Sequence, residues 1–253
     1  MITRTITISL FVFLFVFSQV VSAQEEVKIE SIQVTDQIYM LTGQGGNLGL
    51  FVGQDGTFLI DDQFAPLSEK IIGAITSVGG DSPKFLINTH FHGDHTGGNE
   101  NFGKRGTLIF SHNNVRDRLR HGSYIREFDM KRSGVEDIAL PVVTFSEDIS
   151  FHLNGDEVHV IHIPHSHTDG DSIIHFRSAN VIHAGDVVFN GFYPFIDVNH
   201  GGSIKGMITG VKKIIALSDG NTQIIPGHGP LTDKAELGNY LKMLETAYER
   251  LRK

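Results

Sequence analysis

Three histidines and an aspartate lie within six positions of the segment 89–98, which reads Thr-His-Phe-His-Gly-Asp-His-Thr-Gly-Gly. Such a density of nitrogen and oxygen donors is typical of a metal site. Side chains two residues apart share a face of an extended backbone, so His90 and His92 are expected to bind one ion. Asp94 and His95 follow on a turning loop and are expected to diverge towards a second ion. The spacing therefore predicts two metals.

A site for two ions needs ligands from other parts of the chain, because one loop cannot surround both. Three further candidates each follow or end an apolar, strand-like run, namely His167, Asp186 and His228. Donors of nitrogen and oxygen type suit divalent ions. Zinc is the expected metal, with iron or manganese as alternatives.

The ordered motifs His-x-His-x-Asp-His, His-Thr, Gly-Asp and Gly-His-Gly resemble the metallo-β-lactamase-fold hydrolase superfamily over nearly all of the chain after residue 26. The resemblance assigns three residues to each metal: His90, His92 and His167 to the first, and Asp94, His95 and His228 to the second. It makes Asp186 the bridge between them. It also implies an α+β fold, a four-layer αββα sandwich of two similar halves with the metal site at their shared edge.

The expected chemistry is hydrolysis of an ester, lactone, thioester or lactam carbonyl. Two cations that share one water lower its pKa towards neutrality, which makes a bridging hydroxide available as nucleophile. Asp94 borders this position and is the expected catalytic residue, orienting the nucleophile and passing a proton to the leaving group. Asp61, which closes the apolar run 57–60, resembles the family's aspartate that orients a ligand histidine. An ordinary strand-end turn residue is the alternative there.

Other functions stay open within the resemblance. Cysteine-ligand β-lactamases have a thiolate where Asp186 stands and a carboxylate-binding lysine where Phe189 stands, so β-lactam hydrolysis is expected to be weak or of an ancestral type. The oxygen bridge of Asp186 instead resembles that of lactonases, glyoxalase II and related ester or thioester hydrolases. A persulfide-dioxygenase-like oxidoreductase with one iron is a second alternative. A non-enzymatic metal-binding protein is a third.

Composition indicates a turn-rich globular chain, and a small-molecule substrate is the expected partner. The 253 residues are 40% hydrophobic and include 28 glycines, and this length suits one large two-layer domain or two small ones. The formal charge is -8, and no dense Lys/Arg patch appears, which argues against nucleic acid as a partner. The chain has no cysteine and therefore no disulfide. Nothing in the sequence indicates its oligomeric state.

Residues 1–23 are predicted to be a secretory signal peptide, followed by one hydrolase domain over 24–253. Arg4 gives a basic start, Ile6 to Phe17 is an apolar run, and Val21-Ser22-Ala23 has the small residues of a cleavage site. We expect a periplasmic or secreted protein with no stable membrane insertion after cleavage. An uncleaved anchor is the alternative.

Two similar halves are predicted, each with strands, then a helix, then a further strand. The first is expected to have strands near 28–34, 37–41, 48–52, 57–60 and 85–88, with a helix near 67–77. The second is expected to have strands near 150–153, 157–163, 172–176, 180–183 and 223–225, with a helix near 203–217. Asp233 and Glu236 predict the start of a C-terminal helix laid on a sheet, whose apolar stripe is Leu237, Leu241, Leu244, Tyr248 and Leu251.

Two segments are expected near the mouth of the site. Residues 121–140 have mixed charge and little periodicity, which predicts a loop or irregular helix that is either a pocket wall or a spacer. An aromatic cluster after Asp186 is either core or an apolar pocket wall: Phe189, Phe192, Tyr193 and Phe195. His165 stands two residues before His167, but the pattern His-Thr-Asp-Gly favours His167 as the ligand.

Overall fold

The computed structural model describes residues 26–252. The predicted signal peptide over 1–23 lies outside the described residues. Among the described helices, none combines the length and apolar character needed to cross a membrane.

The first half of the chain forms a seven-stranded sheet with the order β1-β2-β3-β4-β5-β6-β9. Its strands are β1 (Glu30–Gln33), β2 (Ile38–Thr42), β3 (Leu48–Phe51), β4 (Phe58–Ile60), β5 (Phe85–Ile87), β6 (Leu108–His112) and β9 (Val143–Phe145). Neighbours from β1 to β4 are antiparallel, whereas β4, β5, β6 and β9 run parallel. The residues after β5 therefore emerge at the carboxyl end of the parallel part, the edge at which α/β sheets commonly bind ligands.

The second half forms a six-stranded sheet with the order β10-β11-β12-β13-β14-β15. Its strands are β10 (Asp148–Leu153), β11 (Asp156–His162), β12 (Ser172–Phe176), β13 (Val181–Phe189), β14 (Gln223–His228) and β15 (Thr232–Asp233). Among these neighbouring strands, only β13 and β14 run parallel to each other. Both strands end near the loop that follows β5, which brings the predicted ligands of the two halves together.

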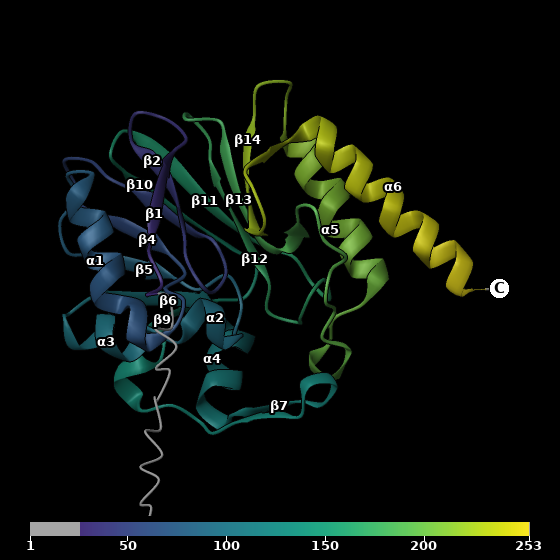
Figure 1. Cartoon of the computed structure of the whole chain (residues 1–253), viewed down its shortest axis with the longest axis horizontal. Coiled ribbons are helices and arrows are strands. Elements are labelled where there is room, and N and C mark those ends of the chain that lie inside the picture. The colour runs from purple at the N-terminus through teal and green to yellow at the C-terminus, as the bar shows by residue number, and fades with distance from the viewer. Residues whose placement is uncertain (1–25, 253) are drawn as a thin grey trace, which may run out of the picture.

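Helices cover the outer face of each sheet and complete four layers (Figure 1). The first sheet carries α1 (Ser68–Ser77), preceded by the 3-10 turn η1 (Ala65–Leu67), and α3 (Asn99–Lys104). The second carries α5 (Ile204–Leu217) and α6 (Lys234–Leu251). The remaining helical segments are α2 (Gly93–Thr96), α4 (Asn113–His121), η2 (Arg126–Phe128), η3 (Asp137–Ala139) and η4 (Val198–His200). The predicted αββα sandwich is confirmed.

The core lies in three apolar layers between these elements. Aromatic rings fill the space between the sheets, with Phe51 against Phe176 and Phe58 against Phe151, each pair 5.2 Å apart between ring centroids. Burial of one such side chain contributes about 1.5–3 kcal/mol to stability. A second layer joins the first sheet to Ile71 of α1, and a third joins the second sheet to α5 and α6.

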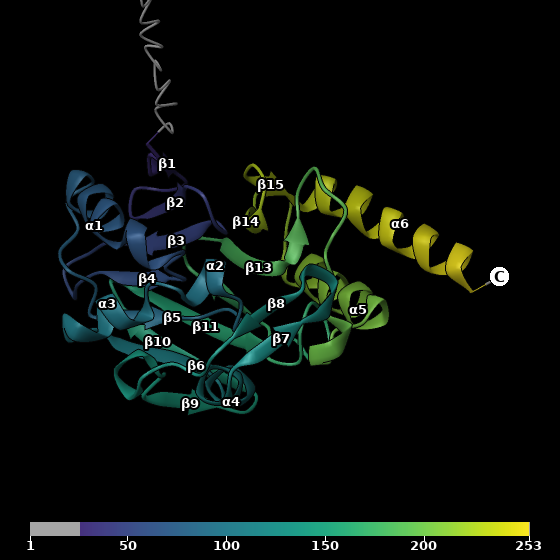
Figure 2. The same ribbon diagram turned by 60° about the horizontal axis from the view of Figure 1, so that its bottom comes forward.

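Three expected elements differ from the structure. Residues 121–140 contain a hairpin of β7 (Ser123–Ile125) and β8 (Met130–Arg132) in place of a loop or irregular helix. Its strands have three residues each, too short to show an alternating pattern. Figure 2 shows the hairpin near α4 and α5. The C-terminal helix begins at the predicted cap, where Asp233 accepts from the backbone N–H groups of Ala235 and Glu236.

The end of that helix extends beyond the sheet instead of lying on it (Figure 1). Of the predicted apolar stripe, Leu237 and Leu244 are buried, whereas Leu251 is exposed.

The third difference concerns β13, which was expected near 180–183 but continues to Phe189, so Asp186 lies inside a strand. All nine residues of this strand are buried, and its pairing with β14 shifts around Gly185, which has a φ of 50°. Glycine tolerates this left-handed conformation without a steric penalty.

Candidate metal centre

The histidine motif is positioned by its own neighbours in sequence. Phe91 is buried in a cluster with Val115 and Leu119 of α4, and this contact anchors the segment between His90 and His92. The turning loop expected at Asp94 and His95 is a single helical turn, α2, in which the N–H of His95 donates to the carbonyl of His92 at 3.0 Å. This turn separates the two histidines of the first pair from the residues that follow.

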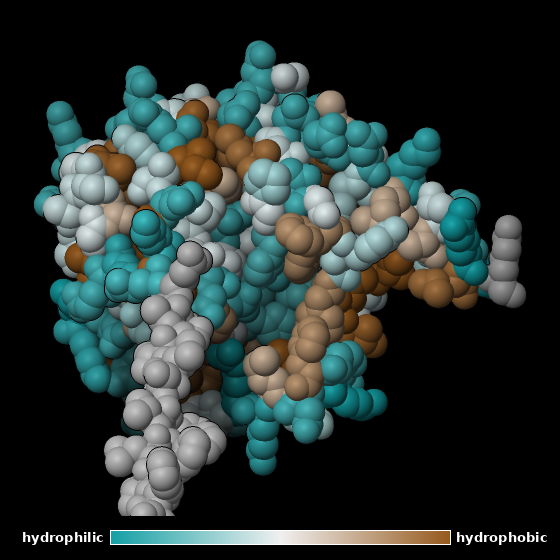
Figure 3. Space-filling model, in the orientation of Figure 1, coloured by the Kyte–Doolittle hydropathy of each residue, from teal (hydrophilic) through white to brown (hydrophobic). Residues whose placement is uncertain are grey.

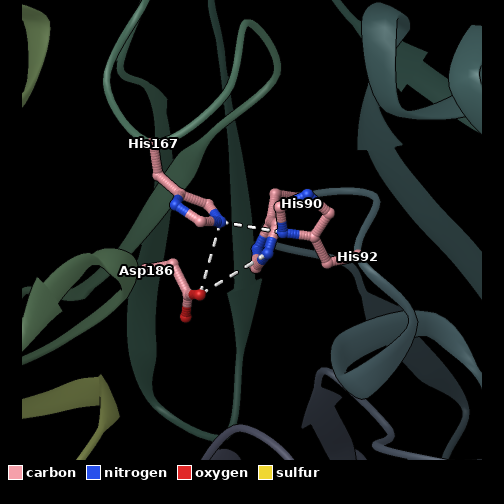
Figure 4. Close-up of side chains that lie close together, drawn as sticks. All are labelled: His90, His92, His167 and Asp186. Atoms are coloured by element: carbon pink, nitrogen blue, oxygen red, sulfur yellow. Dashed lines mark hydrogen bonds and ion pairs between the residues drawn. The ribbon is translucent and has the colours of Figure 1, made fainter. Parts of the chain in front are cut away.

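A first group of side chains could hold a metal ion: His90, His92, His167 and Asp186. One donor atom from each lies within 4.8 Å of the others. His167 Nε2 lies 2.8 Å from His92 Nδ1 and 3.4 Å from Asp186 Oδ2, while His90 Nε2 lies 3.8 Å from the same oxygen (Figure 4). All four side chains are buried.

A second group contains Asp94, His95 and His228, and one donor atom from each again lies within 4.8 Å of the others. Asp94 Oδ2 lies 3.3 Å from His228 Nε2 and 3.6 Å from His95 Nε2. His95 is buried, but Asp94 and His228 are 29% and 28% exposed. The seven residues expected from the sequence are thus brought together in two groups.

Asp186 faces both groups. Its Oδ1 lies 3.1 Å from His95 Nε2, and its Oδ2 lies 3.4 Å from His167 Nε2 and 3.5 Å from His228 Nε2. The left-handed turn at Gly185 precedes it directly, and a β-carbon at Gly185 would lie only 2.9 Å from that of Thr89. The chain therefore passes close to the motif loop where Asp186 enters the centre.

Buried polar atoms in the centre fit cations. Among the described residues, His90 Nε2, His95 Nε2 and Asp186 Oδ1 are buried without a hydrogen-bond partner. An unpaired buried donor or acceptor costs about 1–3 kcal/mol, so several in one place indicate an absent ligand. Imidazole and carboxylate donors are those used for zinc and similar divalent ions.

Asp61 holds His95 as the sequence predicted for a ligand-orienting aspartate. Its Oδ2 lies 2.7 Å from His95 Nδ1, which leaves Nε2 directed at the second group. Its carboxylate also accepts from the backbone N–H and the hydroxyl of Thr89, each at 2.7 Å. These contacts tie His95 to the end of β5 and set the orientation of its ring.

Asp197 has the same relation to His92 and was missed by the sequence reasoning. Its Oδ2 lies 2.9 Å from His92 Nε2 and 2.6 Å from His200 Nδ1. His92 thus presents Nδ1 to the first group. His167 is oriented similarly, because its Nδ1 lies 2.8 Å from the carbonyl oxygen of Phe195. An aspartate three residues before a histidine was the available signal, but it caps only the three-residue 3-10 helix η4, which is too short to show a periodic pattern.

The profile of the metallo-β-lactamase superfamily matches residues 41–235, well over half of the chain. The chain belongs to the metallo-β-lactamase superfamily. It is accordingly an enzyme, a metal-dependent hydrolase with a His-rich metal-binding cluster.

Solved metallo-β-lactamases share the fold. One from Pontibacter korlensis aligns with a TM-score of 0.70 and 18% identity, covering 86% of this chain and 99% of its own. The DIM-1 metallo-β-lactamase gives 0.70 and 16%, with 88% and 100% covered. VMB-1 gives 0.69 and 15%, with 87% and 98% covered. At these identities the likeness shows the fold alone.

In this metallo-β-lactamase superfamily member, the pKa values of the imidazoles differ between the two groups of side chains. Burial lowers the pKa of His167 to about 4 and that of His90 well below its ordinary value. Burial acts in the same direction on His95, but Asp186 and Asp94 reverse it and raise the pKa of His95 well above its ordinary value. For His228, hydrogen bonds to both carboxylates overcome burial and raise the pKa to about 9.

A cavity of about 360 Å³ opens onto both groups. The 121–140 segment forms one of its walls through the hairpin residues Ile125, Phe128, Met130 and Arg132. The predicted aromatic cluster divides: Phe189 and Phe195 line the cavity, whereas Phe192 and Tyr193 are exposed beside α6. In Figure 3 a tan to brown band borders a teal hollow at the centre of the molecule.

Histidines outside the motifs are placed elsewhere. His165 is exposed, has a φ of 54°, and its Nδ1 lies 3.0 Å from the carbonyl oxygen of Gly201. His183 is buried in β13, with Nε2 3.1 Å from the carbonyl oxygen of Asn47. Neither belongs to the two metal groups, in keeping with the choice of His167 from the sequence.

Proposed function

We propose that the two groups bind two divalent metal ions, with zinc as the first choice, and that the enzyme hydrolyses a carbonyl compound. The first ion is assigned to His90, His92 and His167, and the second to Asp94, His95 and His228. The observation that carries this proposal is the placement of Asp186, whose two oxygens face donors of both groups at 3.1 to 3.5 Å.

When bound, such ions supply Lewis acidity and a water of lowered pKa. The residues of the chain then orient and move protons. Burial alone would raise the pKa of Asp94, but His95 and His228 lower it to about 2, so its carboxylate is ionised at neutral pH. Its partial exposure at the cavity lets it accept a hydrogen bond from the nucleophile and relay a proton to the leaving group.

The proposed substrate is a small ester, lactone, thioester or lactam. A cavity of about 360 Å³ lined largely by apolar side chains suits a compact organic molecule. The formal charge of -8 makes a nucleic-acid partner unfavourable. Export to the periplasm or medium, after cleavage of residues 1–23, is part of the proposal.

β-Lactam hydrolysis is a second candidate, supported by the solved metallo-β-lactamases that share the fold. It is disfavoured as the main activity because Phe189 stands where the resemblance expects a carboxylate-binding lysine. A one-iron oxygenase would leave the second group without a metal. The close approach of Asp94, His95 and His228 favours the two-metal hydrolase.

Metal analysis and a substrate panel test the proposal. Purified protein, saturated and then passed through a desalting column, should retain close to two zinc ions per chain. It should hydrolyse at least one member of an ester, lactone, thioester and lactam panel, and a chelator should abolish the activity. One tightly held ion at saturation, or oxygen consumption by an iron form, would overturn it. Mass spectrometry of the exported protein should place its N-terminus at Gln24.

A further inference from the structure

Arg132 occupies an unusual position in the hairpin wall. It is the last residue of β8, and its guanidinium lies directly over Gly93. In the sequence, Gly93 separates the proposed ligands His92 and Asp94. A β-carbon built on Gly93 would overlap the guanidinium, so only glycine permits this approach. The side chain thereby becomes part of the cavity that contains the metal groups.

The Arg132 guanidinium has no hydrogen-bond acceptor among residues 26–252, although the side chain is partly enclosed by protein. Arg116 and Arg118 on the adjacent helix α4 are both held, by the carbonyl oxygen of Pro141 and the carboxylate of Asp169. Arg132 is partly buried and lines the metal cavity without such a partner. A guanidinium in this setting offers its planar fork of N–H donors to the occupant of the cavity.

The rest of the cavity defines what that occupant resembles. Phe64, Phe189 and Phe195 give it apolar walls, and β13 contributes no lysine or arginine on the opposite side. Carboxylates nearby on the hairpin have other partners: Glu127 accepts from Asn199, and Asp129 accepts from the Tyr124 hydroxyl. Arg132 is thus the cation available to an anionic group that enters beside the metals.

A second cavity extends from the same arginine, and its lining is basic. It has a volume of about 510 Å³ and is lined by Arg126 and Lys131 as well as Arg132. In a chain with a formal charge of -8, three cations along one groove concentrate positive potential where a negative substrate would approach.

We infer that Arg132 determines specificity by binding a carboxylate on the substrate, so that the substrate is an anionic carbonyl compound with an apolar body. This inference rests on the proposed hydrolase function. A guanidinium can pair with a carboxylate through two parallel N–H···O bonds, which fixes the orientation of the substrate relative to the metals. A neutral ester or lactone would leave the fork unpaired.

Two esters with the same leaving group test this inference in the zinc-loaded enzyme: 4-nitrophenyl acetate and the mono-4-nitrophenyl ester of glutaric acid. The parent should favour the anionic ester in kcat/KM. Arg132→Gln should lower the ratio of the two kcat/KM values about tenfold or more, mainly through KM, because one charge-assisted pair is lost. The ratio for Arg132→Lys should lie between the ratios for the parent and for Arg132→Gln.

Arg120→Gln provides the matched control. It removes one positive charge from the exposed end of α4, and Arg120 does not line the metal cavity. The parent ratio should persist in this variant. An equal fall in both variants would show that overall charge, not Arg132, sets the preference.

Binding supplies a readout that is independent of turnover. Calorimetric titration of the zinc-loaded protein with 3-mercaptopropionate and 2-mercaptoethanol compares two thiols that differ in a carboxylate. Arg132→Gln should weaken the first about tenfold relative to the second. If no member of the ester, lactone, thioester and lactam panel is hydrolysed but this preference is seen, the hydrolase proposal fails and the role of Arg132 stands.

The inference is overturned if the parent shows no preference for the anionic ester or thiol, or if Arg132→Gln retains that preference. Circular dichroism and zinc content establish that the variant is folded. Should it fail to fold, competition by glutarate in the parent decides: inhibition no stronger than by 1-pentanol would overturn the role of Arg132.

Discussion

The two metal groups lie side by side and share Asp186, yet they differ in burial. In the first group, the side chains of His90 and His92 are 1% and 7% exposed. In the second group, Asp94 and His228 are nearly 30% exposed at the wall of the cavity. The side chains of the first group are therefore buried although His92 and His167 line the cavity, while Asp94 and His228 of the second group combine metal donors with more access for a substrate.

Protonation makes the same division. Burial keeps His90 and His167 neutral near pH 7, and a neutral imidazole is ready to bind a cation. His95 and His228 hold protons because carboxylates stabilise their charged forms. A metal must displace these protons before it binds. The comparison teaches that burial and neighbouring carboxylates give the imidazoles of one centre opposite protonation states, and the proposed two-ion centre would therefore bind its two ions with different pH dependence.

The largest effect is expected from Asp186, since its loss removes the residue common to both groups. Asp186→Ala should weaken each ion by more than the ten- to hundredfold that is typical of groups that only orient ligands. His183→Ala, in the same strand, is the control and should keep nearly full metal content. Competition with a chromophoric chelator measures both affinities. Equal metal loss in the two variants would refute a special role for Asp186.

Asp94 is expected to separate catalysis from metal binding in the second group. Asp94→Asn keeps the size and one oxygen donor but removes the charge that orients the nucleophile and relays its proton. Turnover per bound metal should fall about a hundredfold or more, with only partial metal loss. Hydrolysis of the best panel substrate, divided by zinc content, measures this. Parent-like normalised activity would reduce Asp94 to a ligand.

The pH dependence of zinc binding should differ between the groups. The pKa of His228 is about 9 and that of His95 is raised, so at lower pH protons compete with the second ion. Affinity for that ion should rise about tenfold per pH unit for each proton displaced, between pH 6 and 8. His167, with a pKa of about 4, has no proton to lose in this range, so the first ion should change little. Parallel pH curves in zinc titrations would contradict the comparison.

The smallest effects should come from the residues that orient ligands, and they form a matched pair. Asp61 holds His95 of the second group, and Asp197 holds His92 of the first. Asp61→Asn should weaken the second ion about tenfold, and Asp197→Asn should weaken the first by a similar factor. Stepwise zinc titration resolves the two ions. Weakening of the same ion in both variants would show that the groups are not separately supported.

Much of the centre could be predicted because its signals are local. The alternation of an extended backbone places His90 and His92 on one face, and the structure groups them with His167. Strands β2 to β5 and helices α1 and α5 were expected within a few residues of their observed bounds, since each has a clear apolar pattern. For Asp61, the resemblance suggested a ligand-orienting role beside the alternative of a turn residue, and the contact with His95 Nδ1 agrees with the first.

Long-range contacts account for what was missed. Asp197 reaches His92 across 105 positions of sequence, and no residue pattern near either one encodes that contact. Arg132 enters the cavity only because a hairpin of two three-residue strands folds over Gly93. Short strands carry too few residues for a periodic signal.

The sequence by itself therefore determined the donor types and their close spacing, and the resemblance carried by its motifs predicted the layered fold and a division of the donors between two ions. Only the tertiary structure decided which donors are buried and which face the cavity. That difference arises from packing: His90 and His95 are enclosed, whereas Asp94 and His228 remain partly exposed at the cavity beside the hairpin. Burial and charge in turn set the protonation of each imidazole, which no segment of the chain encodes alone.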